Sequence, residues 1–263
     1  MDRLVEYAGP TDTGKPYARL TLDSPHNRNA LSTTLVSQLH QGLRDAAADP
    51  AVRAVVLGHI GGTFCAGADL AESSAASAAS PFDLAVGRAR DLTALLRAIV
   101  ESPLPVIAAI NGHVRAGGMG LVGACDIAVA GPRSTFALTE ARIGVAPAII
   151  SLTLLPKISA RAAARYFLTG ETFSPAEAAA IGLITIAADD VDAAVGSLIA
   201  DVGRGSPQGL AASKALTTAA VLAAFDRDAE RLSVDSARLF VSDEAREGML
   251  AFLQKRPPRW AAR

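Results

Sequence analysis

The sequence predicts an α/β fold that ends in a helical region, and three observations indicate it. Short apolar runs, typical of strands buried on both faces, alternate with amphipathic helical patterns up to about residue 150. From about Ser151 onward, the 3.6-residue period of helices dominates. Hydrophobic residues make up 50% and charged residues 19% of the 263 residues, which is enough apolar material for one large core.

The first part of the chain is expected to alternate strictly between strands and helices. The run ARLTL at 18–22 alternates, whereas VRAVVLG at 52–58 and VIAAI at 106–110 are almost entirely apolar. Between 71 and 80 the run AESSAASAAS is low in complexity and predicts a mobile loop or a frayed helix. The expected strands cover 18–22, 52–58, 106–110 and 126–130, and the expected helices cover about 32–48, 81–101 and 119–125.

The last third of the chain predicts helices with recognisable starts. Ser174–Pro175 with Glu177, and Ser242 before two acidic residues, are typical helix-start signals. We therefore expect an α/β core over 1–195 and a helical region over 196–263. A region of this kind can close a site or build a subunit contact, and it can also simply complete the core.

Composition argues against several classes of function. The formal net charge is -1, which gives no support to binding of nucleic acid or of an anionic membrane. The two cysteines, Cys65 and Cys125, lie in no CxxC or Cys/His cluster, so we expect neither a disulfide framework nor a metal site. The charged N-terminus lacks the apolar stretch of a signal peptide, and no apolar run has transmembrane length. A cytoplasmic protein with reduced thiols is expected.

Two loops are the candidates for chemistry. FCAGADL at 64–70 and VRAGGMGL at 114–121 each follow a buried strand, contain small residues and open a helix. Small residues let a ligand approach the main chain, and free N–H groups at a helix start favour negative charge. Two such N–H groups aimed at one point would form an oxyanion hole. The alternative is tight packing of helix on strand, and neither loop matches a P-loop or a dinucleotide-binding motif.

These loops occur as FCAGADL and INGHVRAGGMGLVGACDIAVAG, and FALTEARIGVAP follows them. In this combination the chain resembles the crotonase (enoyl-CoA hydratase/isomerase) superfamily over about residues 20–186, and more loosely up to the C-terminus. The resemblance implies a ClpP/crotonase-like spiral of ββα units with a helical C-terminal region, assembled as a homotrimer or a dimer of trimers. It also implies an acyl-CoA thioester as substrate and no separate cofactor, because coenzyme A is part of the substrate.

The resemblance assigns roles to particular residues. The backbone N–H groups of Ala68 and Gly117 would polarise the thioester carbonyl and hold the enolate oxygen. Asp69 has the alternative role of a helix N-cap, and Arg28 that of a solvated loop charge. Lys255 is a further candidate for a CoA phosphate, with a solvated charge as the alternative. The positions expected to contact coenzyme A are Arg28, Ala66, Asp69 and Leu70.

The acidic residues depart from the two-glutamate pattern of hydratases in this family. The position three residues after the oxyanion glycine is Gly120, so the first glutamate is missing, and the second matches Glu140. Burial beside an acyl chain would raise the pKa of Glu140 towards that of a general base. The plain alternative is an exposed helix-start acid near Arg142. The combination of GGMG at 117–120 with E-x-R-x-G-x-x-P-A-x-I-S at 140–151 looks more like methylglutaconyl-CoA or isohexenylglutaconyl-CoA hydratases.

Arg115, two residues before Gly117, is a candidate for binding a distal carboxylate or a phosphate, with a surface salt bridge as the alternative. His113 in the same loop is a candidate for holding a water molecule, with packing as the alternative. The leading expectation is an enoyl-CoA hydratase that uses Glu140 as its single acid/base. The alternatives are a Δ3,Δ2-enoyl-CoA isomerase, which needs no water, and an acyl-CoA-binding paralogue with weakened catalysis.

Overall fold

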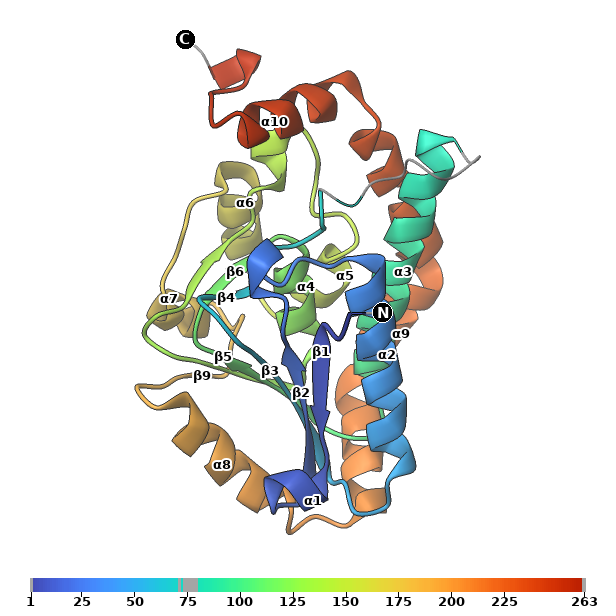
Figure 1. Ribbon diagram of the computed structural model, residues 1–263, viewed down its shortest axis with the longest axis vertical. Helices are drawn as coiled ribbons and strands as arrows, with labels where there is room; N and C mark the ends of the chain where they lie inside the picture. Colours follow the sequence, from blue (N-terminus) through green and yellow to red (C-terminus); the bar gives the residue numbers. More distant parts are fainter. Residues whose placement is uncertain (1, 71, 73–79, 262–263) are drawn as a thin grey trace.

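The computed structural model describes residues 2–70, 72 and 80–261. In Figure 1 the helices α2, α3 and α9 lie along one side of a central sheet, α8 lies on another, and α10 covers one end. The low-complexity run that we expected as a mobile loop or frayed helix, 71–80, lies mostly outside the described residues.

The main sheet is largely parallel, as a chain of alternating strands and helices predicts. Its strand order is β1-β2-β3-β5-β7-β9; β1 is antiparallel to β2, and all later neighbours are parallel. The four expected strands are present, whereas β1, with four residues, and β9, with two, were not predicted from the sequence. The strands described are β1 (Val5–Ala8), β2 (Tyr17–Leu22), β3 (Ala54–His59), β5 (Val106–Ile110), β7 (Ile127–Ala130) and β9 (Ile186–Ala187).

Three short strands form a second parallel sheet: β4 (Thr63–Cys65), β6 (His113–Arg115) and β8 (Thr135–Ala137). They follow β3, β5 and β7 of the main sheet after a short turn, and a helical segment comes next along the chain. This repeat of long strand, short strand and helix is the ββα unit that the resemblance implies. At the positions of β4 and β6 we expected loops, and β8 was not predicted, because a strand of three residues has no detectable period.

Serine N-caps fix the starts of the long helices. The hydroxyls of Ser32, Ser80, Ser174, Ser206 and Ser242 each accept a hydrogen bond from the backbone N–H three residues later. This confirms the helix starts expected after Ser174 and Ser242. The helices of the described chain are α1 (Pro10–Thr13), α2 (Thr33–Ala48), α3 (Pro81–Glu101), α4 (Gly117–Ala124), α5 (Ser151–Leu154), α6 (Ala160–Thr169), α7 (Pro175–Ala180), α8 (Val191–Val202), α9 (Pro207–Phe240) and α10 (Asp243–Leu253), with 3₁₀ helices at Pro25–Asn27, Glu140–Ile143 and Arg259–Ala261.

The two faces of the main sheet pack against different helices. Val55 and Leu57 of β3 belong to the large core, together with Leu95 of α3. Val56 belongs to a smaller apolar cluster with Val195 of α8. The central strands are therefore buried on both faces, which explains why their sequences are continuously apolar.

The 34-residue helix α9 lies beside α3 (Figure 1). Arg97 donates to Asp226 at 2.6 Å, and the hydroxyls of Thr93 and Ser233 are 3.0 Å apart. The boundary expected after residue 195 falls inside α8, which packs on β5 and β7. The division into a core and a helical region stays a prediction.

A buried ion pair fastens α9 to the core. Lys214 Nζ lies 2.8 Å from Asp126 Oδ2 and donates to the carbonyl oxygens of Ile99 and Leu104. Asp126 Oδ2 in turn accepts the backbone N–H of Val106 at 2.7 Å. One charged side chain thus joins α9, the end of α3 and the start of β5. Across the described parts of the chain, no helix is long and apolar enough to cross a membrane.

Candidate active site

The first loop places the Ala68 N–H at a turn that requires glycine. Gly67 has φ +92°, a conformation that side chains disfavour, and its carbonyl accepts the backbone N–H of Leu31 at 2.7 Å. A Cβ atom placed on Gly67 would lie 2.7 Å from the Cβ of Ala116 in the second loop. Glycine at 67 therefore lets the two loops touch.

The second loop delivers Gly117 as the first residue of α4. Ala116 before it has φ +45°, an uncommon conformation for a residue with a side chain, and all of α4 is buried. A Cβ placed on Gly117 would lie 3.8 Å from the Ala68 nitrogen. Within residues 2–70, 72 and 80–261, neither the Ala68 N–H nor the Gly117 N–H donates to an acceptor. Two free donors thus lie close together, as an oxyanion hole requires.

Glu140 lies on the segment that leaves the small sheet next to this loop. β8 pairs with β6 in the register Arg115↔Ala137. Glu140 comes three residues after Ala137, and Gly117 comes two residues after Arg115, so the two segments leave the sheet side by side. The residue is 7% exposed, and its Oε2 atom is buried without a hydrogen bond from the described residues. Burial raises the pKa of Glu140 to about 7, against a smaller lowering by its own backbone N–H.

The alternative of an exposed acid beside Arg142 is wrong. Glu140 is buried, and the Arg142 guanidinium turns away and donates to the carbonyl oxygen of Thr169 at 2.9 Å. A carboxyl group that is neutral or ionised with nearly equal ease around pH 7 suits both the removal and the return of a proton.

At Gly120, apolar side chains occupy the space that a glutamate would need. A Cβ on Gly120 would lie 2.5 Å from Ile150 Cγ2 and 3.2 Å from Leu96 Cδ1. The sequence does not predict these contacts, because Ile150 and Leu96 lie 30 and 24 positions from Gly120 and no local pattern indicates them. Position 120 therefore supplies no second carboxylate for a reaction at Glu140.

The residues expected to bind coenzyme A cluster at the first loop. The carbonyl of Arg28 accepts the Ala66 N–H at 3.1 Å, and Asn27 Nδ2 donates to Asp69 Oδ2 at 3.0 Å. Arg28 has φ +60° and an exposed side chain, and Leu70 is also exposed. The geometry brings Arg28, Ala66 and Asp69 together next to Ala68. Lys255 lies elsewhere, in the exposed turn after α10.

Arg115 forms no surface salt bridge with the described residues, although we considered one. Its guanidinium donates to the carbonyl oxygens of Val114 and Thr135 and to Thr135 Oγ1, all within 2.9 Å. Burial lowers the pKa of Arg115. His113 Nδ1 lies 2.8 Å from the same Thr135 hydroxyl. Arg115 thus ties β6 to β8 and supports the strand that leads to Gly117.

The cysteines are structural. Burial raises the pKa of both Cys65 and Cys125 to about 12, so neither is a thiolate at neutral pH. A side chain at Gly118 would collide with Cys65, since a Cβ there would lie 2.8 Å from the Cys65 carbonyl oxygen. Among the residues that the structure describes, no group of His, Cys, Asp or Glu is arranged to hold a metal ion.

Known proteins are similar to this chain in sequence and in fold. Residues 13–263 match the family Enoyl-CoA hydratase/isomerase. A crystal structure of an enoyl-CoA hydratase from Mycobacterium avium is similar with a TM-score of 0.92 and 77% identity, covering 99% of this chain and 100% of that chain. Enoyl-CoA hydratase EchA19 of Mycobacterium tuberculosis is 32% identical over 273 residues, covering 100% of this chain and 97% of the relative.

A relative with a different printed activity also matches. The peroxisomal Delta(3,5)-Delta(2,4)-dienoyl-CoA isomerase of Arabidopsis thaliana is 27% identical over 262 residues, covering 95% of this chain and 94% of the relative. The ββα repeat, the two touching loops and the C-terminal helices give this chain the crotonase fold. The matched region includes both loops and Glu140. The chain belongs to the enoyl-CoA hydratase/isomerase (crotonase) family.

Proposed function

We propose that this protein is an enoyl-CoA hydratase, which adds water across the 2,3 double bond of a 2-enoyl-CoA thioester. The observation that carries the proposal is Glu140: a buried carboxyl with one oxygen unpartnered among the described residues and a pKa raised to about 7. Family membership and the relatives named enoyl-CoA hydratase support the same reaction class.

The two loops supply the electrophilic half of the mechanism. The thioester carbonyl oxygen would accept hydrogen bonds from the N–H groups of Ala68 and Gly117. The charge on that oxygen grows as water adds at C3 and an enolate forms, so these donors would stabilise the transition state more than the substrate. The start of α4 at Gly117 adds the positive end of a helix dipole.

Glu140 would supply both proton transfers. Its carboxylate takes a proton from water while the water oxygen forms a bond to C3 and the π electrons move to the enolate. The protonated Glu140 then returns that proton to C2, the C2–H bond forms and the carbonyl is restored. A pKa of about 7 serves both steps because the group is neither too weak a base nor too weak an acid.

A second candidate is a Δ3,Δ2-enoyl-CoA isomerase, which the apolar contact at Gly120 favours. Ile150 and Leu96 fill the place from which a second carboxylate would hold the water. A single base can move a proton from C2 to C4 or back with no water in the site. An acyl-CoA-binding paralogue is disfavoured by the buried, available Glu140.

The remaining assignments are part of the same proposal. Arg28, Ala66, Asp69 and Leu70 would contact coenzyme A, no other cofactor is required, and the subgroup would be methylglutaconyl-CoA hydratase-like. A cytoplasmic homotrimer or dimer of trimers is proposed. Its support is a set of apolar side chains that α9 and α10 leave exposed, Leu216, Leu239, Leu250, Phe252 and Leu253.

A substrate panel tests the proposal. Crotonyl, long-chain 2-enoyl, methylglutaconyl and 3-enoyl CoA are incubated with the enzyme while ultraviolet absorbance and product mass are followed. A hydratase consumes the conjugated chromophore, and its product is heavier than the substrate by one water molecule. An isomerase creates the chromophore from the 3-enoyl substrate, and the mass is unchanged. Turnover that persists in Glu140→Gln would contradict both, and tight binding without turnover would support the acyl-CoA-binding alternative.

A further inference from the structure

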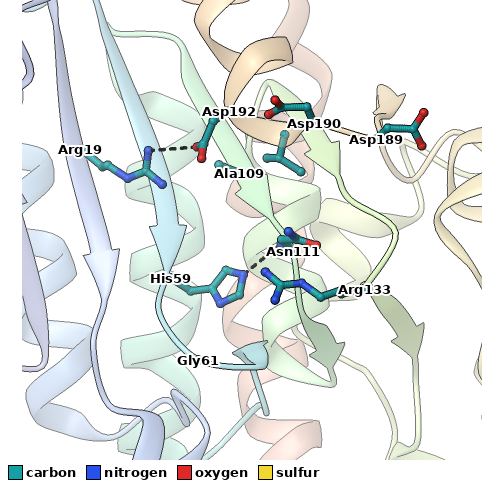
Figure 2. A pocket seen from close by; sticks show the side chains of 10 residues that line it. Arg19, His59, Gly61, Ala109, Asn111, Arg133, Asp189, Asp190 and Asp192 are labelled. Carbon is teal, nitrogen blue, oxygen red and sulfur yellow. Dashed lines mark hydrogen bonds and ion pairs between the residues drawn. The ribbon is translucent and has the colours of Figure 1, made fainter.

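A polar cavity of about 400 Å³ lies on the face of the main sheet that α8 covers (Figure 2). Its lining brings together Arg19, His59, Asn111, Arg133 and the acidic turn 189–192. None of the residues assigned above to catalysis or to coenzyme A lines it. The cavity is therefore separate from the proposed site of the enoyl-CoA reaction.

The end of β3 and the first residue after β5 form the floor of this cavity. The backbone N–H of Asn111 donates to His59 Nε2 at 3.0 Å, so the hydrogen of the neutral ring is on Nδ1. The Asn111 Oδ1 atom is buried and accepts no hydrogen bond from the described residues. Gly131 gives the carboxamide room, since a Cβ there would lie 2.7 Å from Oδ1. The floor thus carries a buried hydrogen-bond acceptor that has no donor among the described residues.

Two arginines approach this floor. In the described structure Arg133 forms no ion pair or hydrogen bond, and Figure 2 shows its guanidinium next to His59 and Asn111. Arg19 lies 3.7 Å from Asp192, a side chain that is 83% exposed, so the pair is weak. Burial lowers the pKa of His59, and the charges of Arg133 and Arg19 lower it further, so both cations act on the same space.

The aspartates of the turn 189–192 leave the Arg133 guanidinium available. Asp190 Oδ1 accepts the backbone N–H of Ala193 at 3.0 Å as the N-cap of α8. Asp192 faces Arg19, and Asp189 points away from the floor in Figure 2. The Arg133 guanidinium is therefore open to a ligand that accepts hydrogen bonds, whereas the Asn111 Oδ1 atom is itself an acceptor and needs a donor, such as the O–H of a hydrogen phosphate.

We propose that this cavity binds a small oxyanion, a phosphate or a carboxylate, held by the Arg133 guanidinium with Arg19 beside it. A guanidinium presents its N–H groups in a fork that matches two oxygens of such a group. At roughly 30 Å³ per water molecule, a cavity of about 400 Å³ has room for about a dozen waters. It can therefore accept an organic phosphate or carboxylate as well as inorganic phosphate.

Titration of the full-length protein tests the site. Inorganic phosphate and succinate are added separately at constant ionic strength while NMR follows the His59 ring, assigned with a His59→Gln variant. We expect a saturable shift of the His59 signals. In Arg133→Gln the dissociation constant should rise at least about tenfold, as expected when a charge-assisted hydrogen bond is lost. A preference for phosphate or for succinate then identifies which kind of anion the cavity takes.

Arg161→Gln is the matched control, because Arg161 is an exposed arginine of α6 that makes no ion pair with the described residues. It should bind both anions as the unmodified protein does, and turnover of enoyl-CoA should be unchanged in both variants. The proposal is overturned by a linear, unsaturable response, or by equal binding in Arg133→Gln. It is also overturned if His59 responds only after the native oligomer is dissociated, since a neighbouring subunit would then cover the cavity.

Discussion

Glu140 should weaken the folded state at the pH where it is useful. Burial raises its pKa from 4.5 to about 7. At about 1.36 kcal/mol per pKa unit, ionising this carboxyl inside the folded protein costs about 3 kcal/mol. The folded state holds the proton more tightly than the unfolded state does. The stabilisation that the protonated Glu140 carboxyl contributes to the free energy of unfolding is therefore complete below pH 4.5. It is lost as the pH rises from 4.5 through 7.

Replacing the charge tests this cost directly. Glu140→Gln keeps the shape of the side chain and cannot ionise, so at pH 8 it should be more stable than the unmodified chain by up to about 3 kcal/mol. The difference should shrink towards pH 4.5. For a chain of this size, each kcal/mol corresponds to a Tm change of roughly 2–4 °C.

Urea unfolding at several pH values between 4.5 and 8 measures the effect, and catalytic turnover is followed in parallel. Glu6→Gln serves as the control, because Glu6 is an exposed glutamate on β1; it should change stability little at any pH. If Glu140→Gln and the unmodified protein showed the same pH dependence of unfolding, Glu140 would not be a buried, destabilised acid. The proposed acid/base role would then lose its physical basis.

Further predictions concern the pH dependence of catalysis, the space at Gly120 and the ion pair between Lys214 and Asp126. The kcat/KM for an enoyl-CoA should fall about tenfold per pH unit below about 7, as Glu140 becomes protonated in the free enzyme; a flat profile down to pH 5.5 would contradict a base with this pKa. Gly120→Ala should destabilise the chain by about 1–3 kcal/mol in urea unfolding, because its Cβ meets Ile150. Gly87→Ala, where no atom of the described residues lies within 4 Å of the new atom, should instead stabilise α3 by about 0.5–1 kcal/mol. Lys214→Met should cost about 3–5 kcal/mol by leaving Asp126 buried without its cation, and Lys214→Met with Asp126→Asn should recover part of the loss in thermal unfolding.

Local sequence patterns were sufficient for the long elements. α3 occupies the expected range 81–101, because Ser80 caps it, Pro81 fits its first turn and its apolar residues repeat at helical spacing. A short helix after the strand 106–110 was likewise predictable from the small residues there, although α4 begins at Gly117, two residues before the expected start at 119. In both places, the residues that decide the structure are neighbours in sequence.

Features made by distant residues were not predictable in the same way. β4, β6 and β8 are three residues long and exist because they pair with one another across the fold. The contact that closes the space at Gly120 comes from Ile150, and the polar cavity combines Arg19 of β2, Asn111 after β5 and Arg133 after β7. No local period or motif encodes such contacts, since each depends on where the whole chain places its backbone.

The burial of Glu140 belongs to this second class, and it gives the helical C-terminal region a role. α10 packs on the 3₁₀ helix Glu140–Ile143 with backbone against backbone: a Cβ on Gly248 would lie 2.5 Å from the Ile143 carbonyl oxygen. On the other side, a Cβ on Gly144 would lie 2.7 Å from the Glu244 carbonyl carbon. These two glycines allow α10 to approach the segment that carries the acid. Because burial is what raises the pKa of Glu140, we propose that the helical region helps to close the site in addition to completing the core.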